Sequence, residues 1–196
     1  MKIKPLLFAL LLAVPSLAMA DDTKTTDKPA DKPKTTEKLA LADDDAKVIA
    51  HVKHVNDMEI EMGKLAKTNG TASTKAYGNT LVKDHTANNT KLTALAKKKG
   101  IATIPADEPM NDIEKQDHQK MMDDMAKLKT LKGAEFDKEF IPMMIEGHDK
   151  EVGRLDAALA SVKDADVVAH LKVTKPVVQR HADAARELQK KAVSMK

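Results

Sequence analysis

The sequence predicts an all-α fold, an antiparallel bundle of four long helices with one or two additional short helices. From Asp43 onward the apolar residues recur with a period close to 3.6, and no convincing strand alternation interrupts them. Hydrophobic residues make up 42% and charged residues 32% of the 196-residue chain, which is typical of a globular protein. Long amphipathic segments of this kind assemble naturally into a bundle.

The first helix is expected to begin at the acidic residues 43–45 and to run toward Gly70. The second should occupy about residues 73–99 and stop at Gly100, because glycine is the preferred residue after the end of a helix. The stripes that these two helices turn inward are Val48, Val52, Val55, Glu59, Met62 and Ala66, and Tyr77, Leu81, His85, Asn88, Leu92 and Leu95.

A shorter and a longer helix follow a loop over residues 101–110. Asn111 with Glu114 three residues later is a capping pattern that begins the shorter helix, which ends near Thr130. The longer helix is expected over about residues 134–162. Its inward stripe is Ile141, Met144, His148, Val152, Leu155 and Leu159.

The end of the chain predicts an interrupted helix. A short helical piece is expected over about residues 166–173. Pro176 then begins or kinks the final helix, because proline has no backbone N–H to donate. The stripe of this last helix is Val177, His181, Ala184 and Leu188.

The first twenty residues have the features of a secretory signal peptide. Lys2 and Lys4 form its positive start, residues 6–14 its apolar stretch, and residues 18–20 an A-x-A cleavage pattern. We therefore expect export to the periplasm with cleavage after Ala20, and an association with the outer membrane stays open. No stretch reaches the about 18 apolar residues that a membrane span needs, so no transmembrane segment is predicted.

A disordered tether is expected over residues 21–42, which leaves residues 43–196 for the helical domain. Residues 21–38 are rich in Asp, Lys, Thr and Pro and contain no apolar residue larger than alanine. Such a segment cannot bury enough surface to offset the entropy lost on ordering.

The composition excludes several classes of protein. The chain has no cysteine, which excludes disulfide scaffolds, cysteine-based zinc and iron–sulfur sites, and cysteine nucleophiles. It has no tryptophan, one tyrosine and three phenylalanines, too few rings for a base-stacking surface. Two of the three net positive charges belong to leader lysines, so we expect no nucleic-acid partner.

Each long helix carries one polar residue within its apolar stripe: Glu59, His85, His148 and His181. We expect these side chains to face the bundle axis. Bundles build metal sites from side chains on facing helices, and one carboxylate with three imidazoles suits a divalent transition ion such as Zn, Fe, Ni or Cu. The hypothesis is one bound ion, provided that the four residues lie at one height in the bundle.

Two acidic residues are alternates in this site. Glu61 and Asp84 lie within two residues of Glu59 and His85, so each is a candidate ligand or a candidate partner that orients a ligand. Asp149 and Asp183 are further candidates for the orienting role, although adjacent residues on a helix point in different directions.

Other interpretations of the histidines stay open. Histidines on an apolar face can be core residues that are satisfied by hydrogen bonds, as in a structural or interaction module of the cell envelope. Methionines near His118 and His148 suit Cu(I), but methionine at helical spacing is more often core filler. His51 and His54 form an i, i+3 pair that could chelate a metal ion, but the charged residues around them favour a solvated face.

The search for enzyme signatures returns none of the common motifs. The sequence contains no G-x-S-x-G, no P-loop, no G-x-G-x-x-G and no H-E-x-x-H. No nucleophile–base pair can be identified, and we predict no catalytic residue.

Five short motifs, in this order and spacing, resemble a known family of exported bacterial proteins. They are EIEMG at 59–63, LVKDHT at 81–86, LKGAEFD at 131–137, MMIEGH at 143–148, and Lys175-Pro176 followed by His181. The sequence is similar to domain-of-unknown-function family 4142, over about residues 44–188. The resemblance implies a ferritin-like helical bundle, an envelope location and recurring polar positions, but no activity. Di-iron ferritins have Glu-x-x-His on two helices, and no histidine here has an acid three residues before it.

Overall fold

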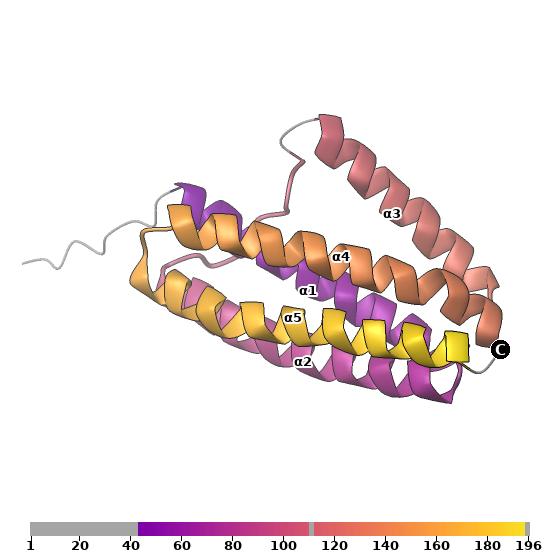
Figure 1. Cartoon of the computed structure of the whole chain (residues 1–196). Coiled ribbons are helices and arrows are strands. Elements are labelled where there is room, and N and C mark those ends of the chain that lie inside the picture. Colours follow the sequence, from indigo (N-terminus) through magenta and orange to yellow (C-terminus); the bar gives the residue numbers. More distant parts are fainter. Residues whose placement is uncertain (1–42, 110–111, 195–196) are drawn as a thin grey trace, which may run out of the picture. The chain divides into compact units, whose positions relative to one another are not determined.

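The computed structural model describes residues 43–109 and 112–194, and the regular structure within these ranges is helical. The predicted all-α bundle is confirmed (Figure 1). The predicted leader over 1–20, the predicted tether over 21–42 and the predicted cap at Asn111 lie outside the described residues. The helices are α1 (Asp43–Asn69), α2 (Ala72–Lys98), α3 (Asp112–Thr130), α4 (Gly133–Ser161) and α5 (Ala165–Ser194).

The sequence predicted a break in the last helix before Pro176, and this prediction is wrong. Residues 165–194 form one continuous helix, α5, with Pro176 inside it. Proline removes one intrahelical hydrogen bond, but Pro176 and Lys172, whose carbonyl loses its partner, are both exposed, so that water can satisfy this carbonyl. Pro142 lies inside α4 in the same way.

The inward face of α5 also differs from the predicted stripe. Val178, Ala182 and Ala185 are buried, whereas Ala184 is exposed. His181 is buried as expected, at 2% exposure. Because alanine dominates this part of the helix, the apolar pattern alone leaves the rotation of the helix uncertain by one position.

Hydrogen bonds at both ends of the bundle show how the helices are connected. The carboxylate of Asp45, at the start of α1, accepts from the backbone N–H groups of Lys163 and Asp164 in the turn between α4 and α5. At the other end the carboxylate of Asp137 accepts from the N–H and hydroxyl of Thr71, in the turn between α1 and α2. The α1–α2 and α4–α5 hairpins therefore lie together with α2 parallel to α4.

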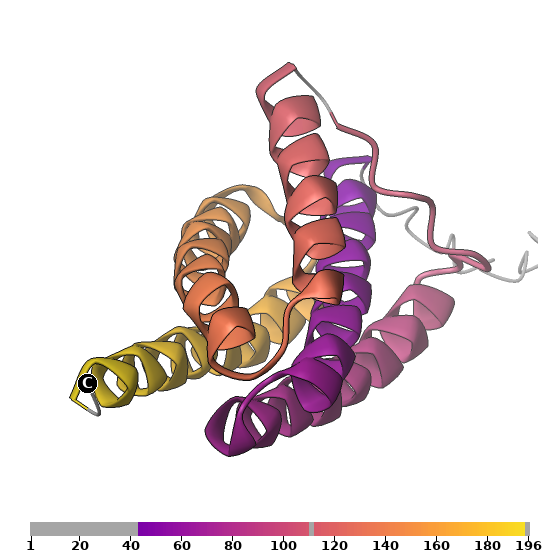
Figure 2. The same ribbon diagram turned by 90° about the vertical axis from the view of Figure 1, so that its right-hand side faces the viewer.

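A long crossover joins the two hairpins. It runs from Lys99 to Lys132, contains α3, and returns the chain from one end of the bundle to the other (Figures 1 and 2). One long crossover is also the connection found in ferritin-like bundles. Figures 1 and 2 show α3 standing away from the four long helices at its start and approaching them toward Thr130. Among the described side chains of α3, Leu128 is the one that is buried.

Two glycines let α1 and α2 approach closely. A Cβ built on Gly78 would lie 2.6 Å from the carbonyl oxygen of Gly63 and 2.8 Å from the Cβ of Ala66. A Cβ built on Gly63 would lie 2.8 Å from the carbonyl oxygen of Gly78. Since such distances are shorter than any carbon contact permits, the spacing of this hairpin depends on both glycines.

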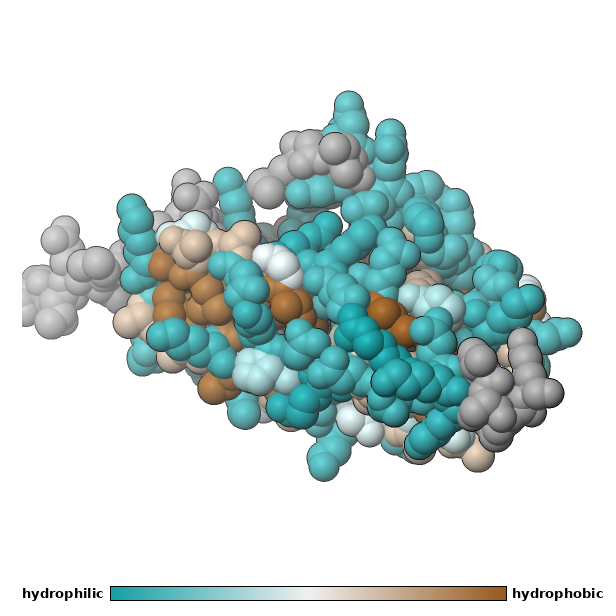
Figure 3. All heavy atoms as spheres, in the orientation of Figure 1, coloured by the Kyte–Doolittle hydropathy of each residue, from teal (hydrophilic) through white to brown (hydrophobic). Residues whose placement is uncertain are grey.

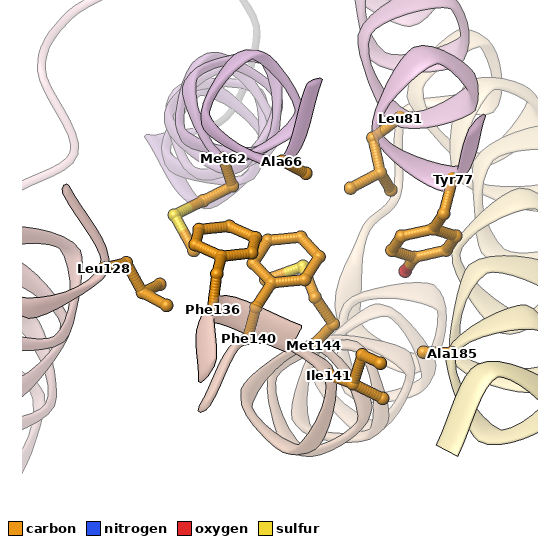
Figure 4. Close-up of a cluster of buried hydrophobic side chains, with 10 residues drawn as sticks. All are labelled: Met62, Ala66, Tyr77, Leu81, Leu128, Phe136, Phe140, Ile141, Met144 and Ala185. Carbon is orange, nitrogen blue, oxygen red and sulfur yellow. The ribbon is translucent and has the colours of Figure 1, made fainter. Parts of the chain in front are cut away.

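Two apolar clusters fill the interior. The phenylalanine cluster lies toward the α1–α2 turn, and the aliphatic cluster lies toward the α4–α5 turn. The phenylalanine cluster, drawn in Figure 4, contains Met62, Ala66, Tyr77, Leu81, Leu128, Phe136, Phe140, Ile141, Met144 and Ala185. The aliphatic cluster contains Ile49, Val52, Leu92, Ala96, Leu155, Val162, Val167, Leu171 and Val178.

The surface is mainly hydrophilic on the face shown in Figure 3. Hydrophobic colour gathers there where α4 ends and α5 begins. The partly buried Leu159 and Val168, near these helix ends, pack against the aliphatic cluster. Within the described ranges no helix has a stretch that is long and apolar enough to cross a membrane.

The close approach of α1 and α2 gives a test of the fold. Gly78→Ala should lower the free energy of unfolding by about 1–3 kcal/mol, because the added methyl meets the backbone of α1. The matched controls are Gly147→Ala and Gly153→Ala in α4, where nothing lies within 4 Å of the added Cβ. These controls should raise the free energy of unfolding by about 0.5–1 kcal/mol, the usual gain for Gly→Ala in a helix. Urea denaturation would measure both, and a neutral or stabilising Gly78→Ala would contradict the assigned helix spacing.

Candidate metal centre

The four residues that interrupt the helical stripes lie at one level of the bundle, between the two apolar clusters. His85 of α2, His148 of α4 and His181 of α5 are buried, with 2–3% of their surface exposed. One ring nitrogen from each of the three lies within 4.8 Å of the other two. Oε2 of Glu59, on α1, is 3.8 Å from Nε2 of His148. The structure therefore brings together one side chain from each long helix.

One nitrogen of each imidazole is held by a hydrogen bond from outside the cluster. Nδ1 of His85 lies 2.8 Å from Oδ1 of Asn56, and Nδ1 of His148 lies 2.8 Å from the carbonyl oxygen of Met144. Nε2 of His181 lies 3.0 Å from a carboxylate oxygen of Asp84. Since each of these partners is an acceptor, each ring carries its proton on the nitrogen that faces outward.

The inward atoms of the cluster have no hydrogen-bond partner in the protein. These buried atoms are Nε2 of His85, Nε2 of His148, Nδ1 of His181 and Oε2 of Glu59. Three nitrogen lone pairs and a carboxylate oxygen thus point into one shared space without a donor among them. A cation at this place would satisfy all four atoms at once.

The spacing suits a single ion. Two nitrogens bound to one zinc ion at about 2.0–2.1 Å lie about 3.3–4.2 Å apart. The 4.8 Å limit of the three histidines therefore requires inward shifts of less than about 1 Å, which side-chain rotation can supply.

Burial favours the neutral form of two imidazoles of the cluster, those of His85 and His181. Desolvation, with repulsion from His181 and His148, lowers the pKa of His85 to about 3. Desolvation also lowers the pKa of His181, against the opposing hydrogen bond to Asp84. Burial raises the pKa of Glu59 against the opposing interaction with His148, and the charge of Glu151 raises it further. Neutral imidazoles are the form that binds metal, so the environment prepares the donors for a cation.

A buried polar network, which the sequence did not reveal, supports His85. Nδ2 of Asn56 donates to Oδ1 of Asn88 over 2.9 Å. Nε2 of His170 lies 3.1 Å from the same oxygen, and Nδ2 of Asn88 donates to the hydroxyl of Thr174 over 2.7 Å. Asn88 was on a predicted inward stripe. For Asn56, His170 and Thr174, only their position on the helical repeat could have indicated that they point inward.

The two alternate acids have different places in the structure. Asp84 orients His181 through the hydrogen bond described above. Glu61 is exposed and forms an ion pair with Lys64 on the outer face of α1, because two residues along a helix turn a side chain by about 200°. Asp149 and Asp183 also face outward, where both bond Arg186.

The described methionines near His118 and His148 lie in different surroundings. Met144 is buried in the phenylalanine cluster, and Met125 and Met143 pack against it. Met122 is 50% exposed. Their positions agree with the alternative of core filling.

The expectation that His51 belongs to a solvated face is wrong. Its side chain is 27% exposed, and its two nitrogens bond Asp107 at 2.8 Å and Glu151 at 3.1 Å. Burial lowers the pKa of His51, but the hydrogen bonds and charges of Glu151 and Asp107 outweigh it and raise the pKa above its ordinary value. The crossover loop that supplies Asp107 is far away in the sequence, so periodicity gave no indication of this pairing.

Comparison with known proteins places the sequence in a family. The profile of the family described as "Domain of unknown function (DUF4142)" matches residues 30–188, which include all four residues of the centre. No curated protein and no solved structure matches the sequence.

The lowered histidine pKa values predict acid sensitivity of the metal-free protein. His85 is protonated near pH 6.5 in the unfolded chain but only near pH 3 in the folded one. The unfolded state therefore binds the proton between these values, and the free energy of unfolding should fall by about 1.4 kcal/mol per pH unit from this group as the pH drops. His181 acts in the same direction, and Glu59 opposes it because a raised carboxyl pKa favours the folded state at low pH.

Urea denaturation at pH 7, 6 and 5 in the presence of a chelator would measure this slope. His85→Gln should flatten it, whereas His118→Gln, at an exposed position, should leave it unchanged. An identical slope in wild type and His85→Gln would contradict the prediction.

Proposed function

The chain belongs to the family described as domain of unknown function (DUF4142), and we propose that it is an exported helical bundle that holds one divalent transition-metal ion. The ligands are His85, His148, His181 and Glu59. The ion is held for sequestration or for stress tolerance in the cell envelope.

One observation carries this proposal: four buried side-chain atoms from four helices converge without a hydrogen-bond donor among them. A buried polar atom without a partner costs about 1–3 kcal/mol, and four at one level are an unusual concentration of that cost. The alternative role as hydrogen-bonded core histidines accounts for the outward nitrogen of each ring and leaves the inward one without a function.

The donor set indicates the class of metal. Three imidazole nitrogens and one carboxylate oxygen suit Zn, Fe, Ni or Cu in the divalent state, whereas Mg and Ca prefer oxygen ligands. When bound, the ion supplies the positive charge that stabilises Glu59 as a carboxylate in the interior. Asn56, Asp84 and the Met144 carbonyl hold the three rings in the tautomer that binding requires.

Holding rather than conversion is favoured by the surroundings of the centre. The phenylalanine and aliphatic clusters lie on either side of it along the bundle, and its three histidines are at most 3% exposed. Such a position retains an ion well, and it gives a substrate no direct approach to the ion.

Metal analysis of protein purified without a histidine tag tests the proposal. We expect one transition-metal ion per chain after incubation with Zn²⁺, and a raised midpoint of thermal unfolding because the ion binds the folded state. The double substitution His85→Ala/His148→Ala should abolish both the bound ion and the rise of the thermal midpoint. The matched control, His54→Ala/His118→Ala, also removes two histidines and should keep one ion per chain at equilibrium. A wild-type protein without metal, whose midpoint Zn²⁺, Cu²⁺, Ni²⁺ and Fe²⁺ all leave unchanged, would refute the proposal.

The choice between the two nearby glutamates gives a second test. Glu59→Gln should weaken Zn²⁺ binding by about tenfold or more, because it removes the charged ligand. Glu61→Gln removes the same charge from the same helix but at an exposed position, and it should leave the affinity unchanged. Competition with a chromophoric chelator would measure both affinities. Equal effects of the two substitutions would show that general charge, not coordination by Glu59, attracts the ion.

A further inference from the structure

A second group of side chains with metal-binding chemistry lies beside the centre, and the proposed function leaves it unexplained. It contains His51 and His54 of α1, Asp107 of the crossover, His118 of α3 and Glu151 of α4. His51 joins Asp107 and Glu151 through its two nitrogens, at 2.8 and 3.1 Å. The rings of His54 and His118 stack with their centroids 5.6 Å apart. Side chains from four separate segments are thus gathered at one place, which we call the outer group.

The outer group extends from the surface to the interior. His118 is exposed, His54 and His51 are half-buried, and Glu151 is buried at 6% exposure. Imidazoles and carboxylates are ligands for the same class of ion as the centre itself.

Its inner end adjoins the least buried ligand of the centre. Glu151 follows His148 by one turn of α4, and His51 precedes Glu59 by two turns on the same face of α1. The side chain of Glu59 is 12% exposed, against 2% for His148 and 3% for His181. The centre therefore meets the outer group at Glu59.

The helix that covers the outer group is the least packed one. Of the described side chains of α3, Leu128 is buried, near the end of the helix and ten residues beyond His118. The described side chains from Lys115 to Lys120, around His118, are exposed or half-buried, and Asp117 forms ion pairs with Lys150 and Arg154 of α4 at 3.9 and 3.8 Å. Ligand exchange at this side needs no disruption of either apolar cluster.

The opposite side of the bundle, between α2 and α5, has a groove without histidines. A groove of about 420 Å³ between α2 and α5 is lined by side chains such as Ala76, Thr80, Ala184 and Leu188. Tyr77 also lines it, and its hydroxyl donates to the carbonyl oxygen of His181 over 3.1 Å. None of the residues that line this groove is a histidine.

We propose that the outer group is the route by which a divalent transition-metal ion enters the centre. His118 and His54 capture the hydrated ion at the surface, and the carboxylates of Asp107 and Glu151, which His51 joins, pass it inward to Glu59. The ion exchanges one ligand for the next along this path, so it never has to lose its whole hydration shell in one step. This inference rests on the proposed function, since it assigns a path to the same ion.

Stopped-flow mixing of the metal-free protein with Co²⁺ tests the route, with the visible absorption of bound cobalt as the signal. His54→Ala/His118→Ala should reach the wild-type end point about tenfold or more slowly, because the surface capture step is lost. The control Gln116→Ala/Gln119→Ala changes two exposed neighbours of His118 on α3 and should load at the wild-type rate. Ala184→Leu, which fills the α2–α5 groove, should also load at the wild-type rate.

The possible outcomes separate the two proposals. Full loading of His54→Ala/His118→Ala at the wild-type rate would overturn the route and leave the metal centre standing. Slow loading of Ala184→Leu would overturn it as well, because entry would then pass between α2 and α5. Absence of a cobalt signal in the wild type would overturn the proposed function, and the route with it. His118→Ala alone changes one exposed side chain and should slow loading without a risk to folding, so a wild-type rate in this variant would also count against capture by His118.

Discussion

The structure depends on one constraint: a layer of buried polar atoms must be accommodated between two apolar clusters. Apolar packing can be satisfied in many ways, because aliphatic side chains adapt to changes of shape with little loss. A convergent set of lone pairs and a carboxylate has far fewer acceptable arrangements. The relative height of the four long helices is therefore determined most strictly at the level of Glu59 and the three histidines.

Neighbouring features hold this layer in place. The contact of Gly63 with Gly78 sets the distance between α1 and α2, and thus the distance between Glu59 and His85. Asp45 and Asp137 bond the turns at the two ends of the bundle, which limits sliding of one hairpin along the other. The orienting partners of the rings differ in charge: Asp84 is a carboxylate, whereas Asn56 and the Met144 carbonyl are neutral.

Much of the fold could be predicted from the sequence, because helical periodicity and glycine breaks are local signals. The inward phase of Glu59, His85, His148 and His181 was readable in this way, but their common height was not, since it depends on how four helices slide against one another. The phase of α5 was misjudged where alanines occur on several faces. The partners of His51 come from the crossover and from α4, and long-range contacts of this kind leave no mark in a local pattern. Whether an ion occupies the centre stays a prediction.

The division of the interior into two clusters has a consequence for folding. Each cluster includes side chains of α1, α2, α4 and α5, so each end of the bundle can stabilise all four long helices without the other. The histidine layer lies between the two clusters, so it is the level at which the stability of one end can be coupled to that of the other. An ion there would make the bundle unfold as one cooperative unit. Without it, hydrogen exchange would reveal two separately protected ends with a weaker middle.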